Sequence, residues 1–210
     1  MNGMENYVIN IGRQLGSGGR VIGQLLAKEL GIGYYDKELI QLASKESGLG
    51  KEFFERADEK ARFNFLGSFW AGFSNFVNDG FYSDNLLEND SLFQIQSDVI
   101  REQAAKRSCI FIGRCADYVL REHPRSLNIF LCAHEADRIS RIVAAEKVTA
   151  AKAKELLEHV DRKRAGYYSY YSGKAWGAAA SYHLCLNTSA IGLEETAKFI
   201  KAFAKERLNI

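Results

Sequence analysis

Three glycines stand close together near the amino end of the chain, in the stretch RQLGSGGR that begins at Arg13. Glycine accepts positive φ and lets the backbone approach a ligand closely. Consecutive N–H groups at Gly16, Gly18 and Gly19 can therefore turn toward one anion. The residues that follow have helical spacing, and the positive end of that helix would add to the attraction. This glycine loop predicts a backbone cradle for phosphate, with Arg13 and Arg20 on either side.

The glycine loop departs from the standard phosphate loop GxxxxGK[ST], whose lysine binds the β- and γ-phosphates and whose hydroxyl binds Mg²⁺. With Gly18 aligned to the second glycine of that pattern, Arg13 stands at the first. Gly19 then takes the place of the lysine, and Arg20 takes the place of the hydroxyl. The loop alone leaves open both a structural strand-to-helix turn and an anion site, and the flanking arginines favour the anion site.

Further charged residues follow at places where ligands gather. Arg114 comes directly after the apolar run CIFIG, and a guanidinium at a strand end can grip a phosphate with two hydrogen bonds. An ordinary ion pair with a carboxylate is the alternative for Arg114. Arg138 and Arg141 are three residues apart, as are Asp161 and Arg164, so each pair shares a helix face. Taken alone, both pairs are also consistent with a solvated surface.

A segment rich in tyrosine, AGYYSYYSGKAWG, follows Arg164 and precedes the last apolar run. A basic, aromatic segment with glycines is typical of a lid that closes over a substrate, although tyrosines also pack at ordinary surfaces. We expect a lid over residues 149–180. Closure would bring its cations over the loop and exclude water, which is what phosphoryl transfer requires of a protein.

Short apolar runs position these residues. Strands are expected at 7–11, 109–113, 127–133 and 182–187, with a helical pattern after each, and a brief aromatic pair at 34–35 precedes a further helical pattern. Alternation of short apolar strands with helices predicts an α/β fold whose parallel sheet is covered on both faces. Asp36 suits the cap of the helix after the aromatic pair. Ligands bind beyond the carboxyl ends of such strands, which is where the glycine loop and Arg114 are expected.

Composition excludes several classes of protein. The chain has 210 residues, of which 47% are hydrophobic and 26% charged, with a formal net charge of +2. This balance favours neither a nucleic acid polymer nor a membrane as a partner. We expect a cytoplasmic protein, because no signal peptide pattern is visible and no apolar run approaches the about 20 residues of a membrane span. The scattered cysteines at 109, 115, 132 and 185 are expected to be buried, reduced thiols that hold no metal.

One segment, residues 63–85, breaks the alternation. Its aromatic residues recur at steps of three and four, which favours a helix that packs them into the core or into a subunit interface. A ligand-stacking surface and a mobile flap are the alternatives. An interface here would make the protein a homo-oligomer, with two-fold symmetry the commonest form.

The motifs GRQLGSGGRVIGQLLAKELGIGYYDKELI, IFIGRCADYVL, FLCAHEADRISRI and VDRKRAGYYSYYSGKAWG occur in this order. Together they resemble the cytidylate kinase-like family, relatives of cytidylate kinase among the P-loop nucleoside monophosphate kinases. The resemblance covers residues 7–205, except 53–95. It implies a three-layer P-loop kinase fold with a five-stranded parallel sheet and a helical lid. It also implies ATP, Mg²⁺ and CMP or dCMP as ligands.

The resemblance also implies a division of the chain and roles for single residues. One domain, 1–210, would have a core at 7–50 and 92–207 and a helical insertion or monophosphate-binding region at 51–91. Gly16, Ser17, Gly18 and Gly19 match the family's phosphate loop and would hold the donor phosphates, and the flanking Arg13 and Arg20 are expected from their own charge and position to join them. The acceptor would be bound by Asp36, Arg114 and Asp161, where DRKRA is similar to the family's DRNRA. Catalysis would fall to Arg138, Arg141 and Arg164 together with Arg20, with the metal ligands unknown.

These features lead to a nucleotide kinase that moves the γ-phosphoryl group of ATP to CMP, dCMP or a related small acceptor. Three departures from the family pattern argue against full catalytic activity. They are the missing loop lysine, Arg20 at the hydroxyl position, and Leu157 in place of a further arginine. A nucleotide-binding regulatory protein with impaired catalysis is therefore the alternative. A small-molecule kinase or a sulfate-binding enzyme on the same scaffold is a third reading, because an anion cradle does not name the rest of its ligand.

Overall fold

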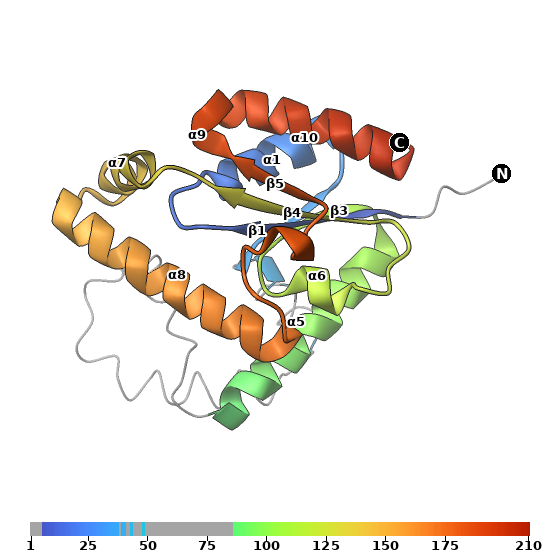
Figure 1. The fold of residues 1–210 in the computed structure, drawn as a ribbon. Coiled ribbons are helices and arrows are strands. Elements are labelled where there is room, and N and C mark those ends of the chain that lie inside the picture. The colour runs from blue at the N-terminus through green and yellow to red at the C-terminus, as the bar shows by residue number, and fades with distance from the viewer. Residues whose placement is uncertain (1–5, 38, 41–42, 44–47, 49–85) are drawn as a thin grey trace.

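The structure is a computed structural model that describes residues 6–37, 39–40, 43, 48 and 86–210. Within them, a parallel sheet of five strands lies between helices on both faces (Figure 1). The α/β fold class predicted from the sequence is confirmed. The aromatic segment 63–85 lies outside the described residues.

The strands have the order β2-β3-β1-β4-β5, and every neighbouring pair is parallel. They are β1 (Val8–Arg13), β2 (Gly33–Tyr35), β3 (Cys109–Ile112), β4 (Ser126–Cys132) and β5 (Leu184–Asn187). In register, Ile11 lies beside Ile112 of β3, and Arg13 lies beside Leu131 of β4. The residues that follow β1, β3 and β4 therefore meet at one edge of the sheet.

Two helices, α1 (Gly19–Leu30) and α10 (Leu193–Leu208), cover one face of the sheet (Figure 1). Ile9 and Ile11 of β1 are fully buried in the core that these helices form. Val8 points to the opposite face, where α5 (Leu86–Lys106) and α6 (Ala116–Val119) close a second core. Side chains alternate along a strand, so Arg13, two residues beyond Ile11, leaves the sheet on the side of α1.

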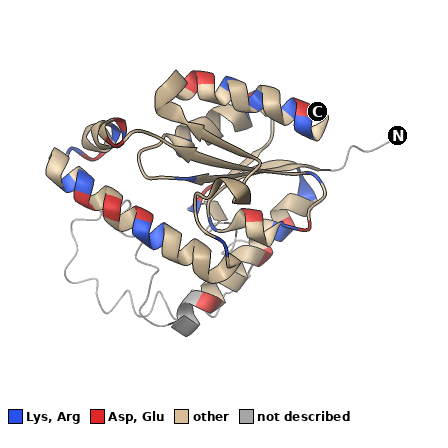
Figure 2. Ribbon diagram, viewed as in Figure 1, with Lys and Arg blue, Asp and Glu red and all other residues tan. Residues whose placement is uncertain are grey.

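Two further helices, α7 (Glu135–Glu146) and α8 (Ala150–Ser172), pack beside the glycine loop. Ile142 of α7 and Leu157 of α8 form a third apolar cluster with Leu15 of the loop. Leu157 replaces an arginine of the family pattern and is 5% exposed, so it stabilises packing under the loop. The charged side chains of α8 lie between Lys152 and Arg164, and its tyrosine-rich last turns, residues 165–172, carry none (Figure 2).

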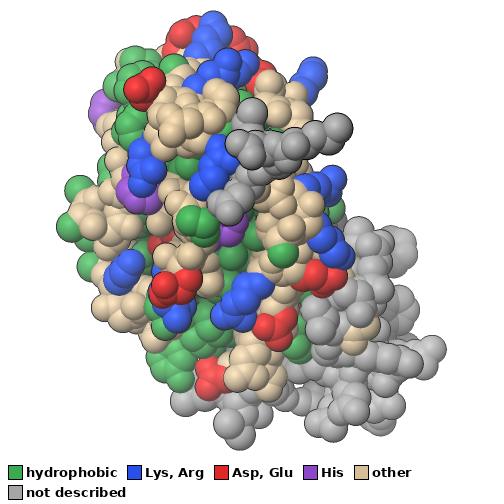
Figure 3. All heavy atoms as spheres, turned by 90° about the vertical axis from the view of Figure 1, so that its right-hand side faces the viewer, with side chains coloured by type: hydrophobic (Ala, Val, Ile, Leu, Met, Phe, Trp, Pro, Cys, Tyr) green, Lys and Arg blue, Asp and Glu red, His purple; other side chains and the backbone are tan. Residues whose placement is uncertain are grey.

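The remaining described elements are short: η2 (Ala179–Ser181) before β5 and α9 (Thr188–Ile191) after it. None of the helices in the described ranges combines the length and apolar character that a membrane span requires. On the side of the molecule away from α7, basic and acidic side chains are intermixed (Figure 3). That face therefore carries no broad field of one sign.

All four cysteines are free thiols. Cys109 and Cys115 are buried, and burial raises the pKa of Cys109 to about 12, which keeps that thiol protonated and unreactive. Cys132 is partly buried and Cys185 is exposed. The expectation of buried thiols is wrong for Cys185, because β5 is an edge strand whose burial is incomplete.

Candidate active site

A cavity of about 410 Å³ lies at the carboxyl end of β1, bounded by the glycine loop (residues 13–20), the end of β3 and helices α7 and α8. A volume of this size suits a small molecule. Among the described lining residues, six are basic and two are acidic. They are Arg13, Arg20, Lys37, Arg114, Arg141 and Arg164, and the acids Asp117 and Glu146. A concave site with this excess of cations attracts anions.

The glycine loop needs glycine at two positions for its backbone path. Gly16 and Gly18 have φ values of 75° and 83°, a region that other residues rarely adopt. A Cβ atom at Gly16 would also lie 2.7 Å from the carbonyl oxygen of Arg138, and one at Gly18 would overlap the side chain of Leu193. The turn is therefore closed against α7 and α10.

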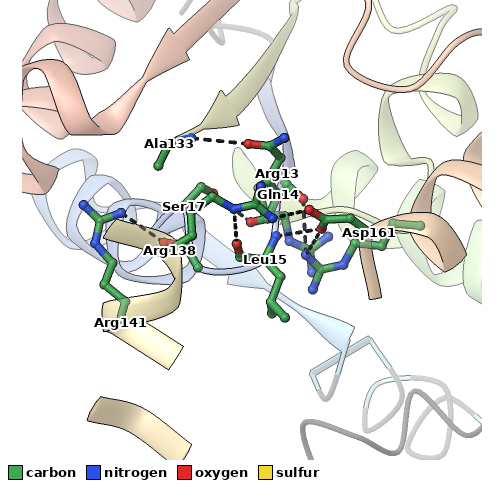
Figure 4. Close-up of polar contacts among 10 residues, drawn as sticks. Arg13, Gln14, Leu15, Ser17, Ala133, Arg138, Arg141 and Asp161 are labelled. Carbon is green, nitrogen blue, oxygen red and sulfur yellow. Dashed lines mark hydrogen bonds and ion pairs between the residues drawn. The ribbon is translucent and has the colours of Figure 1, made fainter. Parts of the chain in front are cut away.

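Four carbonyl groups of the loop accept hydrogen bonds from side chains that surround it, and Figure 4 shows Arg138 and Arg141 beside the loop. Three of the donors are arginines of α7 and α8, which we call the outer arginines: Arg138, Arg141 and Arg164. Arg164 donates to the Arg13 carbonyl at 3.2 Å, and Arg138 donates to the Leu15 carbonyl at 2.7 Å. Arg141 donates to the Gly16 carbonyl at 3.0 Å, and Thr188 donates to the Ser17 carbonyl at 2.9 Å. Arg138 and Thr188 are not among the described lining residues, so the carbonyls of Leu15 and Ser17 are held away from the cavity.

The outward carbonyls determine where the loop N–H groups point. In a planar trans peptide the C=O and the next N–H point in opposite directions, so outward carbonyls at Leu15 and Ser17 turn the N–H groups of Gly16 and Gly18 inward. Neither of these N–H groups makes a hydrogen bond to any described residue. The first turn of α1 begins at Gly19, and its N–H groups have no acceptor within the helix. This is the geometry that the sequence predicts for an anion cradle.

Asp161 and Arg138 lie beneath the loop and are not among the described residues that line the cavity. The Asp161 carboxylate accepts a hydrogen bond from the Leu15 N–H at 2.8 Å and forms ion pairs with Arg138 and, at 3.8 Å, with Arg164 (Figure 4). Burial raises the pKa of Asp161, whereas the Leu15 N–H and both guanidiniums oppose that rise. In this structure the two residues hold α8 and α7 to the loop.

Ser17 is fully buried, and its hydroxyl donates to the Gln14 carbonyl at 2.8 Å. The Gln14 side chain in turn accepts a hydrogen bond from the Ala133 N–H at 3.3 Å and ties the loop to β4. Arg20 stands at the position where the standard loop has a Mg²⁺-binding hydroxyl. The described residues therefore do not reproduce that metal site.

The turn after β3 holds Arg114 at the mouth of the cavity. Gly113, Arg114 and Cys115 have φ values of 74°, 58° and 53°, and side-chain-bearing residues in this left-handed region are strained. The Arg114 guanidinium lies over the Tyr167 ring of α8, 5.9 Å from its centroid. Backbone strain of this kind is concentrated at functional sites.

Asp36 caps the helical turn after β2, as the sequence predicts. Its carboxylate accepts from the Leu39 N–H at 3.2 Å and from the Tyr34 hydroxyl at 3.3 Å, and it lies 3.6 Å from the Arg20 guanidinium. Asp36 is not among the described lining residues, whereas Arg20 is. Asp36 therefore orients Arg20 at the entrance of the cavity.

The inner end of the cavity contains polar groups that sequence reasoning missed. Asn10, in the middle of β1, is 3% exposed, and its side-chain oxygen has no hydrogen-bond partner among the described residues. Asp117 accepts a hydrogen bond from the Tyr168 hydroxyl at 2.7 Å. Burial raises the pKa of Asp117, and the bond from Tyr168 opposes that rise. In the sequence, the only sign of a polar inner end was Asn10, a polar residue inside the apolar run YVINI.

A family model described as the cytidylate kinase-like family matches residues 8–190. The chain belongs to the cytidylate kinase-like family. This membership and the fold confirm the resemblance that the sequence motifs carry, and they support a kinase-type enzyme. The comparison with curated proteins gives no match.

Solved structures share the fold of this family member at low sequence identity. An uncharacterized protein from Eubacterium ventriosum is 23% identical, with a TM-score of 0.70 over 95% of this chain and 99% of that one. A shikimate kinase from Acinetobacter baumannii in complex with shikimate is 13% identical, with a TM-score of 0.52 over 98% and 97%. A gluconokinase from Sinorhizobium meliloti is 9% identical, with a TM-score of 0.53 over 98% and 95%.

The structure brings most of the predicted site residues of this cytidylate kinase-like chain to one cavity. Those that line it are Arg13, Gly16, Gly18, Gly19, Arg20, Arg114, Arg141 and Arg164, whereas Ser17, Asp36, Arg138 and Asp161 support them from outside. Thr188, which is fully buried and bonded to the loop, was missed. Its position directly after β5, at the edge where strand ends meet, is the signal that points to it.

Proposed function

We propose that the protein is a nucleotide kinase-type phosphotransferase that moves the γ-phosphoryl group of ATP to CMP, dCMP or a related small acceptor. One observation carries the proposal: the inward N–H groups of the glycine loop share a cavity with arginines from four separate segments of the chain. Positioning and neutralisation of charge are the main demands of phosphoryl transfer. Membership of the cytidylate kinase-like family supports the same reaction class.

In the proposed reaction, an oxygen of the acceptor attacks the γ-phosphorus in line. The bond from that phosphorus to the β–γ bridging oxygen breaks, and its electron pair stays on ADP. A phosphate acceptor already offers an anionic oxygen, so no proton has to be removed. A hydroxyl acceptor would require a general base, and the carboxylates among the described lining residues are Asp117 and Glu146.

Each part of the site has a proposed role. The N–H groups of Gly16, Gly18 and the first turn of α1 hold the donor phosphates, as helix N-termini do. Arg114 binds the acceptor phosphate with its planar fork of donors. Arg141 and Arg164 line the cavity while they bind loop carbonyls, so they act on the transferred group and fix the loop. Mg²⁺, supplied with ATP, would neutralise phosphate charge when bound.

The test is release of ADP from ATP over a series of nucleoside monophosphates and of small hydroxyl acceptors. The proposal predicts turnover that depends on a monophosphate and that falls about 100-fold in Arg114→Ala, the cost of one transition-state donor. Arg162→Ala, which removes an exposed arginine of α8 outside the cavity, is the matched control and should leave turnover unchanged. Turnover with hydroxyl acceptors alone would assign a small-molecule kinase instead.

A regulatory nucleotide-binding protein with impaired catalysis is the second candidate. It is favoured by the loop itself, because glycine stands at the lysine position and Arg20 at the hydroxyl position. This candidate predicts that ATP raises the melting temperature without any release of ADP. Three further properties stay predictions. Ligand-dependent hydrogen exchange would check the motion of a lid at residues 149–180. Cell fractionation would check a cytoplasmic location, and the mass in solution would check self-association.

A further inference from the structure

The side chain of Arg13 takes an unusual path across the site. A Cβ atom added at Gly19 would lie 2.9 Å from both the Cβ and the Cγ of Arg13. A Cβ atom added at Gly113 would overlap the Arg13 guanidinium. The Arg13 side chain therefore runs from the end of β1, over the first residue of α1, to the turn after β3.

Gly19 differs from the other glycines of the loop because its backbone does not require glycine. Gly16 and Gly18 have positive φ, whereas Gly19 does not. Glycine is also a poor helix former, and Gly19 is the first residue of α1. The contact with Arg13 is thus the structural feature that excludes a side chain at position 19.

The two departures from the standard loop are therefore coupled in space. In the alignment to GxxxxGK[ST], Arg13 occupies the first glycine position and Gly19 the lysine position. The stem of Arg13 fills the volume through which a side chain at position 19 would leave the helix. The first departure supplies a cation, and the second makes room for it.

We propose that Arg13 supplies the positive charge that a loop lysine supplies in the standard pattern, and that residue 19 is glycine so that the Arg13 side chain can reach that place. This inference rests on the proposed phosphotransferase function. It assigns to the chain a built replacement for the lysine rather than a catalytic loss.

The position of the Arg13 guanidinium determines what it would do. It ends beside Gly113, between the loop that holds the donor phosphates and Arg114, which holds the acceptor. As the bond to the β–γ bridging oxygen breaks and its electron pair moves onto ADP, the guanidinium donates hydrogen bonds to the phosphate oxygens on which charge develops. The bond from Arg164 to the Arg13 carbonyl, 3.2 Å long, fixes the backbone from which the side chain extends.

A double-mutant cycle between positions 13 and 19 tests the proposal. The variants are Arg13→Ala, Arg13→Gly, Gly19→Ala, Arg13→Gly/Gly19→Ala and Arg13→Gly/Gly19→Lys, with Arg162→Ala as the control. Three quantities are measured for each: the Kd for ATP and for AMP by calorimetry, the rate of ADP release, and the melting temperature. AMP serves as a probe because it lacks the phosphates that Arg13 would contact.

The proposal predicts that Arg13→Ala lowers the rate of ADP release about 100-fold. The same change should raise the Kd for ATP by a larger factor than the Kd for AMP. In the wild-type background, Gly19→Ala should raise the Kd for ATP and lower the melting temperature, because the new methyl group displaces the Arg13 side chain. In the Arg13→Gly background, which removes both the Cβ and the Cγ that a side chain at position 19 would meet, the same change should leave ATP binding unaltered and raise the melting temperature. Arg13→Gly/Gly19→Lys should recover at least about tenfold in ADP release over Arg13→Gly, since it restores a cation to the site.

Two results would overturn the inference while the proposed function stands. In the first, the wild type releases ADP and Arg13→Ala releases it at a rate within twofold of the wild type. In the second, Gly19→Ala changes the Kd for ATP equally in the wild-type and Arg13→Gly backgrounds. A wild-type chain that neither binds ATP nor releases ADP would overturn the proposed function and the inference together.

Discussion

The outer arginines, Arg138, Arg141 and Arg164, differ from the three we call the inner arginines, Arg13, Arg20 and Arg114. The outer arginines come from α7 and α8 and donate to the carbonyls of the glycine loop. The inner arginines come from the loop and the turn after β3, and all three line the cavity. Of the outer set, Arg141 and Arg164 also line the cavity, so what separates the two sets is that only the outer arginines have hydrogen bonds to loop carbonyls.

This comparison explains how a loop without lysine can be organised to bind phosphate. Backbone N–H groups attract an anion only if they are held inward before it arrives, since preorganised dipoles cost no reorganisation during the reaction. Arg138 and Thr188 provide this by holding the carbonyls of Leu15 and Ser17 outward, and Arg141 and Arg164 fix two further loop carbonyls. Loss of an outer arginine should therefore disturb stability and binding together, whereas loss of an inner arginine should affect the ligand alone.

The largest expected effect is on stability, at the Arg138–Asp161 pair. Arg138→Met leaves the Asp161 carboxylate buried without its main partner, and breaking such a pair costs about 3–5 kcal/mol. Arg138→Met/Asp161→Leu removes both charges and should be less destabilised than the single variant, although Leu15 then loses an acceptor. Urea unfolding checks both. A double variant less stable than the single one would contradict this role.

A large effect on activity with none on stability is expected at Arg114. Arg114→Gly relieves about 1 kcal/mol of left-handed strain, which offsets the lost cation–π contact with Tyr167 of about 0.5–1 kcal/mol. The free energy of unfolding should be unchanged, while kcat/KM for the acceptor falls about 100-fold. Arg114→Ala keeps the strain and should be the less stable of the two. A fall in the stability of Arg114→Gly would place this arginine among the structural residues.

An intermediate effect is expected at Thr188, which bonds to the Ser17 carbonyl and accepts from Arg141 at 3.2 Å. Thr188→Val leaves a buried carbonyl without a donor, a cost of about 1–3 kcal/mol, and should also raise the Kd for ATP. Thr188→Ser keeps the hydroxyl and is the matched control. Thermal melting and calorimetry give the two values. Equal ATP affinity in both variants would show that Thr188 does not help to organise the loop.

The smallest effect concerns pH at the inner end of the cavity. Burial raises the pKa of Asp117 above its ordinary 3.8. Between pH 3.8 and the raised pKa, the folded chain holds a proton that the unfolded chain has lost. The free energy of unfolding should therefore fall as pH rises through this interval, by at most about 1.4 kcal/mol per pH unit.

Asp117→Asn removes the titrating group, so the difference in unfolding free energy between it and the wild type should isolate this slope. Asp98→Asn, at an exposed position of α5, is the control and should retain the slope. A difference of opposite sign would mean that the folded chain lowers the pKa of Asp117.

Most of the fold follows from local pattern. The apolar runs at 109–113 and 127–133 lie within a residue or two of β3 and β4, because short apolar strands between helices have few other places to be buried. The position of Arg114 at a strand end was predictable for the same reason. The roles of Arg138 and Asp161 were not, since helical spacing shows that Asp161 shares a face with Arg164 but not which element that face meets.

The sequence by itself determined the α/β order of elements, the glycine loop and the surplus of arginines, because these depend on residue type and spacing along the chain. Only the tertiary structure decided which arginines hold the loop, which enter the cavity, and that Arg13 passes over Gly19. Those outcomes depend on distances between segments more than 100 residues apart, such as Leu15 and Arg138. Spacing along the chain carries no information about such contacts until the sheet brings the strand ends together.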